Sequence, residues 1–406
     1  MFKYNLNYFC YNFIMKKNLL IIGSIFLFAG CSSSDIYNLS KAAISKDPSA
    51  AFKSLATSKS IHYVSNPKAL QSDIKSLDKN FKKILDIFIK GIMENWGEEN
   101  IELPKQKEYV KYMQNYKSRA LIDFDKGLVT VETLDEENTK QSLHNAIVTT
   151  LLLPDDPRAA DLFNAKKIQL KGTPYLLGEV KDDQNKEIRY SWRANRYANI
   201  LINNIKYKQI TKDNKNIKVS YVQIPMVKDH ATIRVAKFKP IVERYSKKYN
   251  ISANLIYAII KTESNFNQFA VSNAGAIGLM QIVPTSAGKD AYKYIYDKTW
   301  TPTSSYLFEP KNNIELGSAY LKILNTKYLN GIYNLVSQEY CVISAYNTGS
   351  GNVLKTFSSN RTKAKELINK KTPAQVYKTL REKLPYEETR NYLKKVVDNK
   401  KDFIAL

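Results

Sequence analysis

Glu263 is the residue whose type and setting best suit catalysis, since it ends a mostly apolar run with helical character. Ile256 and Ile259 precede it by seven and four residues, so the three side chains share one helical face. If this face packs inward, burial of the carboxyl raises its pKa, because an apolar setting penalises the charged form. A carboxyl that keeps its proton near neutral pH is a general acid. The alternative is a glutamate at a helix end that turns to solvent.

Three short motifs follow in order from this glutamate, and a fourth lies near the end of the chain. They are Glu263-Ser264, Gly278-Leu279-Met280-Gln281-Ile282, Ala345-Tyr346-Asn347 and Thr389-Arg390-Asn391-Tyr392. Each motif alone is weak. The ordered set, over about residues 235 to 400, resembles the soluble lytic transglycosylase domain of the goose-type lysozyme superfamily. The resemblance implies an all-α, lysozyme-like domain over residues 235–406.

The same resemblance implies a reaction and the residues that carry it. The reaction is cleavage of the β-1,4 bond between N-acetylmuramic acid and N-acetylglucosamine in peptidoglycan, with formation of 1,6-anhydromuramic acid ends and without a cofactor. Glu263 is then the catalytic acid and base, and the substrate-binding residues are Ser272, Gln281, Tyr346, Asn347 and Tyr392. On residue type alone, Tyr346 and Tyr392 could instead be half-buried core aromatics. Gln281, inside an apolar run, needs a buried partner or a ligand.

The number of carboxylates near Glu263 bears on the mechanism. Ordinary glycosidases use two carboxylates, one on each side of the bond, but Glu263 is the only acidic residue between Arg244 and Lys289. A single carboxyl can protonate the glycosidic oxygen and then take a proton from the C6 hydroxyl of the sugar. Glu315 or Glu339 could still fold back to the site. A hydrolytic muramidase of the same fold and an inactive peptidoglycan-binding lipoprotein therefore remain as alternatives.

Helical periodicity dominates the part of the chain that contains these motifs. Apolar residues recur at helical spacing over residues 241–249, 253–262, 314–328, 336–346, 373–383 and 389–397. Within this domain, Cys341 lies in an apolar stretch and is expected to be a buried, unreactive thiol.

The region before the helical domain has a different pattern. Residues 77–89 carry an amphipathic stripe, and two alternating runs, 120–124 and 128–134, flank Asp125-Lys126-Gly127 as in a β-hairpin. Further strand-like runs lie at 188–192 and 217–224. Residues 65–225 are therefore predicted to form a small α+β domain without a catalytic constellation, and the whole chain is assigned to the α+β class.

The amino terminus has the pattern of a secretory leader. A basic start at Met15-Lys16-Lys17 precedes an apolar run over 19–28, too short to span a bilayer, and then Ala29-Gly30-Cys31. Residues 1–30 are expected to be a signal peptide, with 1–14 as an upstream extension. The end of this run resembles a lipobox, which implies a lipid anchor on Cys31, a tether over 31–64 and a place at the periplasmic face of the outer membrane. An ordinary cleaved signal is the alternative.

Composition limits the partners. The formal net charge of +24 arises mostly from lysine and suits a polyanion, whether nucleic acid, a membrane surface or an acidic wall polymer. The motifs favour peptidoglycan over nucleic acid. Neither the three cysteines nor the three histidines have the spacing of a metal site, so no metal is expected. The oligomeric state is left open. With the leader and the α+β region, the chain resembles a membrane-bound lytic transglycosylase.

Overall fold

The computed structural model describes residues 79–156, 163–272 and 275–404. The predicted signal peptide, the anchor Cys31 and the tether over 31–64 lie outside the described residues, as does the start of the domain predicted from residue 65. In the part of the chain that the structure describes, no helix has the length and apolar character needed to cross a membrane.

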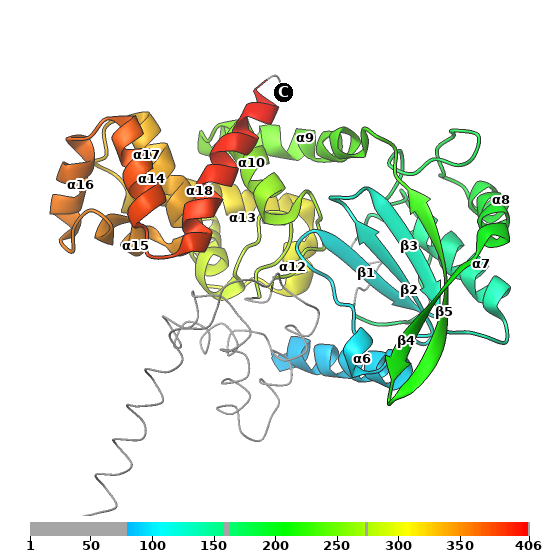
Figure 1. The fold of residues 1–406 in the computed structure, drawn as a ribbon. Helices are drawn as coiled ribbons and strands as arrows, with labels where there is room; N and C mark the ends of the chain where they lie inside the picture. The colour runs from blue at the N-terminus through cyan, green and yellow to red at the C-terminus, as the bar shows by residue number, and fades with distance from the viewer. Residues whose placement is uncertain (1–78, 157–162, 273–274, 405–406) are drawn as a thin grey trace, which may run out of the picture. The chain divides into compact units, whose positions relative to one another are not determined.

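A five-stranded antiparallel sheet organises residues 79–225, which we call the sheet domain (Figure 1). The strands, in the order β1-β2-β3-β5-β4, are β1 (Glu108–Met113), β2 (Ser118–Asp123), β3 (Leu128–Thr133), β5 (Lys215–Pro225) and β4 (Lys206–Lys212). The hairpin predicted around Asp125 joins β2 to β3. Its turn is closed by Asp123, whose Oδ1 accepts the amide N–H groups of Asp125 and Lys126 at 3.1 and 2.9 Å.

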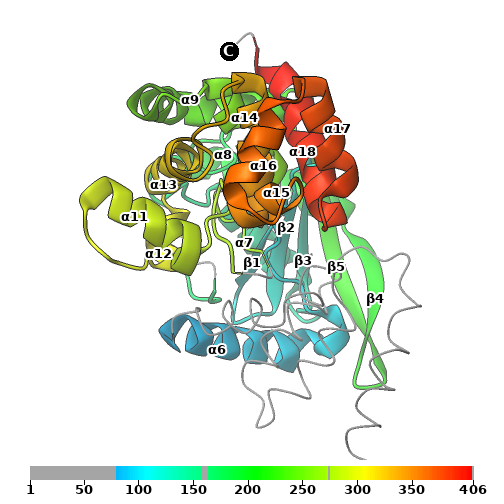
Figure 2. The same cartoon turned by 90° about the vertical axis from the view of Figure 1, so that its left-hand side faces the viewer.

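Helices cover the sheet and close its core. They are α6 (Lys79–Trp96), α7 (Thr139–Leu151) and α8 (Ser191–Leu201), with 3₁₀ turns η1 (Glu98–Asn100) and η2 (Ile202–Asn204). Phe88 of α6 packs edge-on against Tyr112 of β1 with ring centroids 5.6 Å apart, and α6 lies below β1, β2 and β3 in Figures 1 and 2. The predicted amphipathic helix over 77–89 is thus found in α6, although Ile84 of its stripe is 44% exposed.

One predicted strand is wrong. Residues 188–192 were expected to be extended, but α8 begins at Ser191. The reason is tertiary: Ala194, Tyr197 and Ala198 form a buried helical face, and α8 packs against α7. The predicted run 217–224 is confirmed as part of β5.

The described residues from 230 to 404 are mainly helical, as predicted for the region from residue 235, and are called the helical domain. Its elements are α9 (His230–Tyr249), α10 (Ala253–Ser264), η3 (Pro284–Gly288), α11 (Lys289–Tyr296), α12 (Ser304–Phe308), α13 (Pro310–Ile323), η4 (Leu324–Tyr328), α14 (Leu335–Thr348), α15 (Ser350–Lys355), α16 (Arg361–Asn369), α17 (Pro373–Lys383), α18 (Glu387–Lys400) and η5 (Lys401–Phe403). The first helix starts at His230, before the predicted 241, and continues through Pro240, which lies inside it.

The helix α10 lies in the core of the helical domain. The Ser252 hydroxyl caps its first turn by accepting the Leu255 N–H, and Asn265 ends it in the left-handed conformation. Its residues from Leu255 to Ile260 are all buried, and it packs against α9 and α18. This packing sets the direction in which the last residues of the helix, including Glu263, project.

Buried charges join α9 to the sheet domain. Glu179 accepts hydrogen bonds from Arg234 Nε at 2.7 Å and from Lys237 Nζ at 2.5 Å. The Arg234 guanidinium also lies 3.5 Å from the centre of the Phe124 ring. Because buried charges are tolerated only when they are paired, this cluster ties the orientation of α9 to the sheet domain.

Candidate active site

The apolar face of α10 carries Glu263 inward. Ile256 and Ile259 are fully buried, as predicted, and the Glu263 side chain is half-buried. Burial raises the pKa of the Glu263 carboxyl to about 8. The hydroxyl of Tyr392 opposes this shift, and the negative charge of Glu388 adds to it. The solvent-facing alternative for this glutamate is therefore wrong.

Two tyrosines lie around the carboxyl, of which Tyr392 is buried and Tyr346 is half-buried. Tyr392 comes from α18 and Tyr346 from α14, and the negative charge of Glu263 helps burial to raise the pKa of both hydroxyls well above the usual value. Tyr346 Oη donates to the main-chain oxygen of Met280 at 2.8 Å. The Tyr392 hydroxyl is next to Glu263, but the two groups do not meet the geometry of an ordinary hydrogen bond.

Gln281 lies in the loop that Tyr346 contacts, with a left-handed φ of 47°. Its buried side chain donates through Nε2 to the carbonyl oxygens of Gly278 at 2.9 Å and Ala270 at 3.2 Å. The predicted need for a buried partner is therefore met by the backbone. Its Oε1 faces Gln106 of the sheet domain, whose Nε2 is 3.5 Å away.

Asn313 is a buried residue of this loop that sequence reasoning missed. Its Oδ1 accepts the Met280 N–H at 2.8 Å, and its Nδ2 donates to the carbonyl oxygens of Ile277 and Leu307, each at 2.8 Å. Gly278 lies against it, with a φ of +78° and room for no Cβ. Asn312 stands beside it in the polar first turn of α13, so the sequence contained no signal that singles out Asn313.

The other two predicted site residues belong to local networks. Asn347 Oδ1 accepts a hydrogen bond from Thr389 Oγ1 at 2.7 Å, which joins the third and fourth motifs. Ser272 Oγ accepts the Ala276 N–H at 3.0 Å. In the described ranges, Ser272 makes no hydrogen bond to the other predicted site residues. The structure therefore brings Glu263, Tyr346 and Tyr392 together directly, and places Gln281 on the adjoining loop.

The remote acids named from the sequence are occupied elsewhere. Glu315 accepts hydrogen bonds from Lys248 Nζ at 2.6 Å and from Tyr245 Oη at 3.2 Å, and Glu339 pairs with Lys400. The carboxylate whose charge does reach Glu263 is the exposed Glu388, in the first turn of α18. Its place directly before the fourth motif could have drawn attention to it.

Cys341 is fully buried in α14, as predicted. Burial raises the pKa of its thiol to about 12, so almost no thiolate exists at neutral pH. The thiol therefore has the properties of a packing group.

A helical domain with a half-buried glutamate at the end of a core helix is the setting of a lytic transglycosylase. Two family models match the chain: the transglycosylase SLT domain over residues 240–369, and the N-terminal domain of membrane-bound lytic murein transglycosylase C over residues 66–237. The protein is a lytic transglycosylase acting on peptidoglycan. It belongs to the family of membrane-bound lytic murein transglycosylase C.

Relatives support this membership over most of the chain. The membrane-bound lytic murein transglycosylases C of Yersinia pestis (strain Pestoides F) and Yersinia pseudotuberculosis serotype O:1b are both 40% identical over 340 residues, which are 83% of this chain and 94% of each relative. Among solved structures, the 70 kDa soluble lytic transglycosylase of Escherichia coli is 25% identical with a TM-score of 0.31, over 41% of this chain and 24% of that one. That structural similarity is too low to define the fold.

Proposed function

We propose that Glu263 is the single general acid and base of this lytic transglycosylase. The observation that carries the proposal is its carboxyl at the end of α10, half-buried beside Tyr392, with a pKa raised to about 8. Most of such a carboxyl is protonated at neutral pH, which a general acid requires. The bond cleaved is the β-1,4 bond between N-acetylmuramic acid and N-acetylglucosamine.

The reaction proceeds in two proton transfers through one carboxyl. Glu263 first donates its proton to the glycosidic oxygen, the bond from that oxygen to C1 breaks, and N-acetylglucosamine leaves with a hydroxyl. The new carboxylate stabilises the positive charge that develops at C1. It then accepts the proton of the C6 hydroxyl while O6 bonds to C1 and closes the 1,6-anhydro ring. Glu263 is again protonated, and no water is consumed.

The raised pKa serves both transfers. A carboxylate whose conjugate acid has a pKa of about 8 is a stronger base than an ordinary carboxylate, and so is better suited to take a proton from a sugar hydroxyl. The Tyr392 hydroxyl can donate to the carboxylate in the interval when it is charged. Glu263 thus acts as the base in the second transfer, with the Tyr392 hydroxyl beside its carboxylate.

The proposed substrate-binding residues are Ser272, Gln281, Tyr346, Asn347 and Tyr392. The hydrogen bond from Thr389 to Asn347 Oδ1 directs the Asn347 amide nitrogen away from Thr389, where it can donate to a sugar. The Nε2 of Gln281 is used by backbone carbonyls, so Oε1 is the atom that it offers to a sugar hydroxyl or N–H group.

Mass spectrometry of digested peptidoglycan tests the reaction. Products of the wild-type protein are expected to end in 1,6-anhydromuramic acid, which lacks one water relative to a reducing end. Glu263→Gln, which keeps the shape and removes the proton, is expected to release none. Reducing ends alone would contradict the proposal and favour the muramidase alternative. Binding to sacculi without any release by the wild type would favour an inactive wall-binding protein.

Glu388 supplies the specific test of the hydrolytic alternative, because its negative charge contributes to the raised pKa of Glu263. A two-carboxylate hydrolase would need it to activate water. Under our proposal, Glu388→Gln still yields anhydro ends. If that variant lost all turnover while folded, Glu388 would have to be counted as a second catalytic carboxylate.

The anchor is proposed separately from the chemistry. Cys31 follows a lipobox-like run, and the relatives are named as membrane-bound, which supports a lipid on Cys31 and a place at the periplasmic face of the outer membrane. Cys31→Ala is expected to lose fatty-acid labelling and to leave the outer-membrane fraction, whereas Cys10→Ala, before the leader, is expected to change neither. Retention of Cys31→Ala in that fraction without a lipid would contradict the anchor.

A further inference from the structure

The turn that follows Glu263 has an unfavourable backbone conformation. Asn265 and Phe266 have φ angles of 47° and 61°, both in the left-handed region. Asparagine tolerates this region, but an aromatic residue enters it only at a cost in conformational energy. Contacts from outside the turn must therefore hold it in place. Within the helical domain, the ring of Phe266 stacks on Phe238 with ring centroids 6.2 Å apart.

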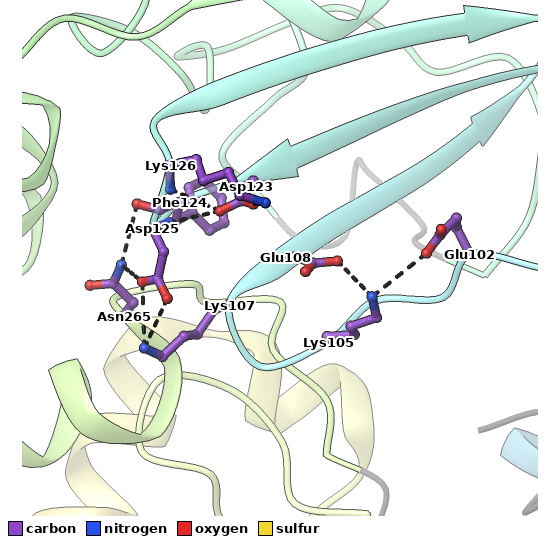
Figure 3. A network of polar contacts seen from close by, with 9 residues as sticks. All are labelled: Glu102, Lys105, Lys107, Glu108, Asp123, Phe124, Asp125, Lys126 and Asn265. Carbon is purple, nitrogen blue, oxygen red and sulfur yellow. Dashed lines mark hydrogen bonds and ion pairs between the residues drawn. The ribbon is translucent and has the colours of Figure 1, made fainter. Parts of the chain in front are cut away.

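The sheet domain supplies the polar contacts of this turn. Asn265 Nδ2 donates to Asp125 Oδ1 at 2.8 Å and to the Phe124 carbonyl oxygen at 3.3 Å (Figure 3). Lys107 Nζ lies 3.0 Å from the other carboxylate oxygen of Asp125 and holds that carboxylate in place. The tip of the β2–β3 hairpin is therefore bonded to the residue that ends α10, two positions after Glu263.

The next residues of the turn reach into the same domain. The buried Asn267 donates through Nδ2 to the carbonyl oxygens of Lys105 and Gln106, each at 3.3 Å. Gln268 Nε2 donates to the Asp155 carbonyl oxygen at 2.6 Å. Buried amides need partners, and for these two side chains the sheet domain provides them.

Residues 105–106 contact both the turn that follows Glu263 and the loop that carries Gln281. Its carbonyl oxygens accept from Asn267, and the Gln106 side chain reaches Oε1 of Gln281 with a nitrogen–oxygen distance of 3.5 Å. Lys105 pairs with Glu108 at 2.8 Å and with Glu102 at 3.7 Å, which stiffens this segment (Figure 3).

We propose that the sheet domain positions the catalytic site: Asp125 acts on Glu263 through Asn265, and Gln106 acts on Gln281. Both are positioning residues. The proposal rests on the proposed roles of Glu263 and Gln281. A displacement of a catalytic group by about 1 Å can lower turnover on the order of a hundredfold. The hydrogen bond between Asn265 and Asp125, two residues from Glu263, can therefore affect the rate.

The test compares Asp125→Ala with Asp125→Asn in the full-length protein. Alanine removes the acceptor for Asn265, and we expect a fall in kcat of about tenfold or more per folded molecule. We also expect the end of α10, freed from this contact, to expose Glu263 more to water, which lowers the pKa of Glu263 and moves the alkaline limb of the pH–rate profile to lower pH. Asparagine retains an acceptor oxygen and is expected to restore most of kcat. Glu137→Ala, at an exposed acid in the loop between β3 and α7, is the matched control and should behave as the wild type.

Gln106→Ala keeps the proposal testable if Asp125→Ala folds poorly, because Gln106 is exposed and its loss should not disturb folding. We expect it to raise KM by a few-fold with little change in the melting temperature. A wild-type kcat and pH profile per folded Asp125→Ala molecule would overturn the role of Asp125, and an unchanged kcat/KM for Gln106→Ala would overturn that of Gln106.

Glu263→Gln, assayed in parallel, separates this proposal from the function on which it rests. If Glu263→Gln is inactive while Asp125→Ala and Gln106→Ala behave as the wild type, only the positioning proposal fails. If Glu263→Gln keeps full turnover, the proposed function fails, and the positioning of Glu263 fails with it.

Discussion

The hydroxyl of Tyr346 donates to the main-chain oxygen of Met280 at 2.8 Å, which joins α14 to the loop that carries Gln281 across 66 positions of the sequence. The same tyrosine lies close enough to Glu263 for the negative charge of that carboxylate to raise the pKa of its hydroxyl. One side chain therefore connects the second and third motifs next to the candidate catalytic carboxyl.

Tyr346→Phe tests that connection. The substitution keeps the ring but leaves the Met280 carbonyl without this donor, so we expect the free energy of unfolding to fall by about 1–2 kcal/mol. Turnover should fall as well, because the Gln281 loop loses a point of attachment. Tyr333→Phe, at a side chain that is 82% exposed, is the control. Equal denaturation midpoints and equal turnover for the two variants would contradict the importance of this hydrogen bond.

Gly278→Ala is expected to damage both the fold and activity. A Cβ at this position would lie 2.3 Å from Asn313 Nδ2 and 2.5 Å from the Leu307 carbonyl oxygen, in a backbone with φ +78°. The added atom therefore breaks the Asn313 network that holds the loop. Thermal unfolding and turnover of the purified variant measure the effect.

Gly349→Ala is the matched control for the glycine substitution. Its φ is +82° and its ψ 148°, a conformation almost confined to glycine, but nothing lies within 4 Å of a Cβ there, so it isolates a backbone strain on the order of 1–3 kcal/mol. Gly278→Ala should lower the melting temperature by clearly more than Gly349→Ala does. Equal losses would show that conformation alone, and not the Asn313 contact, requires glycine at position 278.

Glu263→Gln should stabilise the folded protein in a pH-dependent way. The pKa of Glu263 rises from 4.5 to about 8 on folding, so the folded state binds the proton more tightly than the unfolded state does. The free energy of unfolding of the wild type therefore falls as the pH rises from about 4.5 to about 8. At pH 7 it is lower by roughly 3 kcal/mol than below pH 4.5. Glutamine has no charge to bury, so the free energy of unfolding of Glu263→Gln should exceed that of the wild type by more and more as the pH rises through this range. Denaturation curves at pH 5 and pH 7.5 measure it, and a constant difference would contradict the raised pKa.

The pH–rate profile should report the charge of Glu388. In the proposed mechanism the first step needs a protonated Glu263, so we expect turnover to decline as the pH rises through about 8. Glu388→Gln removes a negative charge that favours the protonated form, so the alkaline limb should move to lower pH while the maximal rate changes little. Glu382→Gln, an exposed acid on α17, is the control. An unmoved limb would mean that Glu388 has no electrostatic role.

Local patterns were sufficient to predict several elements. The spacing of Ile256, Ile259 and Glu263 placed the carboxyl on the inward face of α10, and Asp125-Lys126-Gly127 marked the hairpin between β2 and β3. These features depend on neighbours within a few positions, where side-chain periodicity and turn preferences act directly. The ordered motifs likewise indicated the transglycosylase class, which the family models support.

Only the tertiary structure decided which distant residues complete these elements. Ser191 and Trp192, from the strand-like run predicted over 188–192, became the start of α8, whose buried face packs against α7. Asn313 reaches Met280 across 33 positions, and Asp125 reaches Asn265 across 140. A hydrogen bond between such residues depends on how whole helices and strands pack, because a buried amide needs a partner in space and not in sequence. For that reason the sequence was sufficient to predict the carboxyl, whereas the packing of the two domains decided which distant residues hold the segments around it in place.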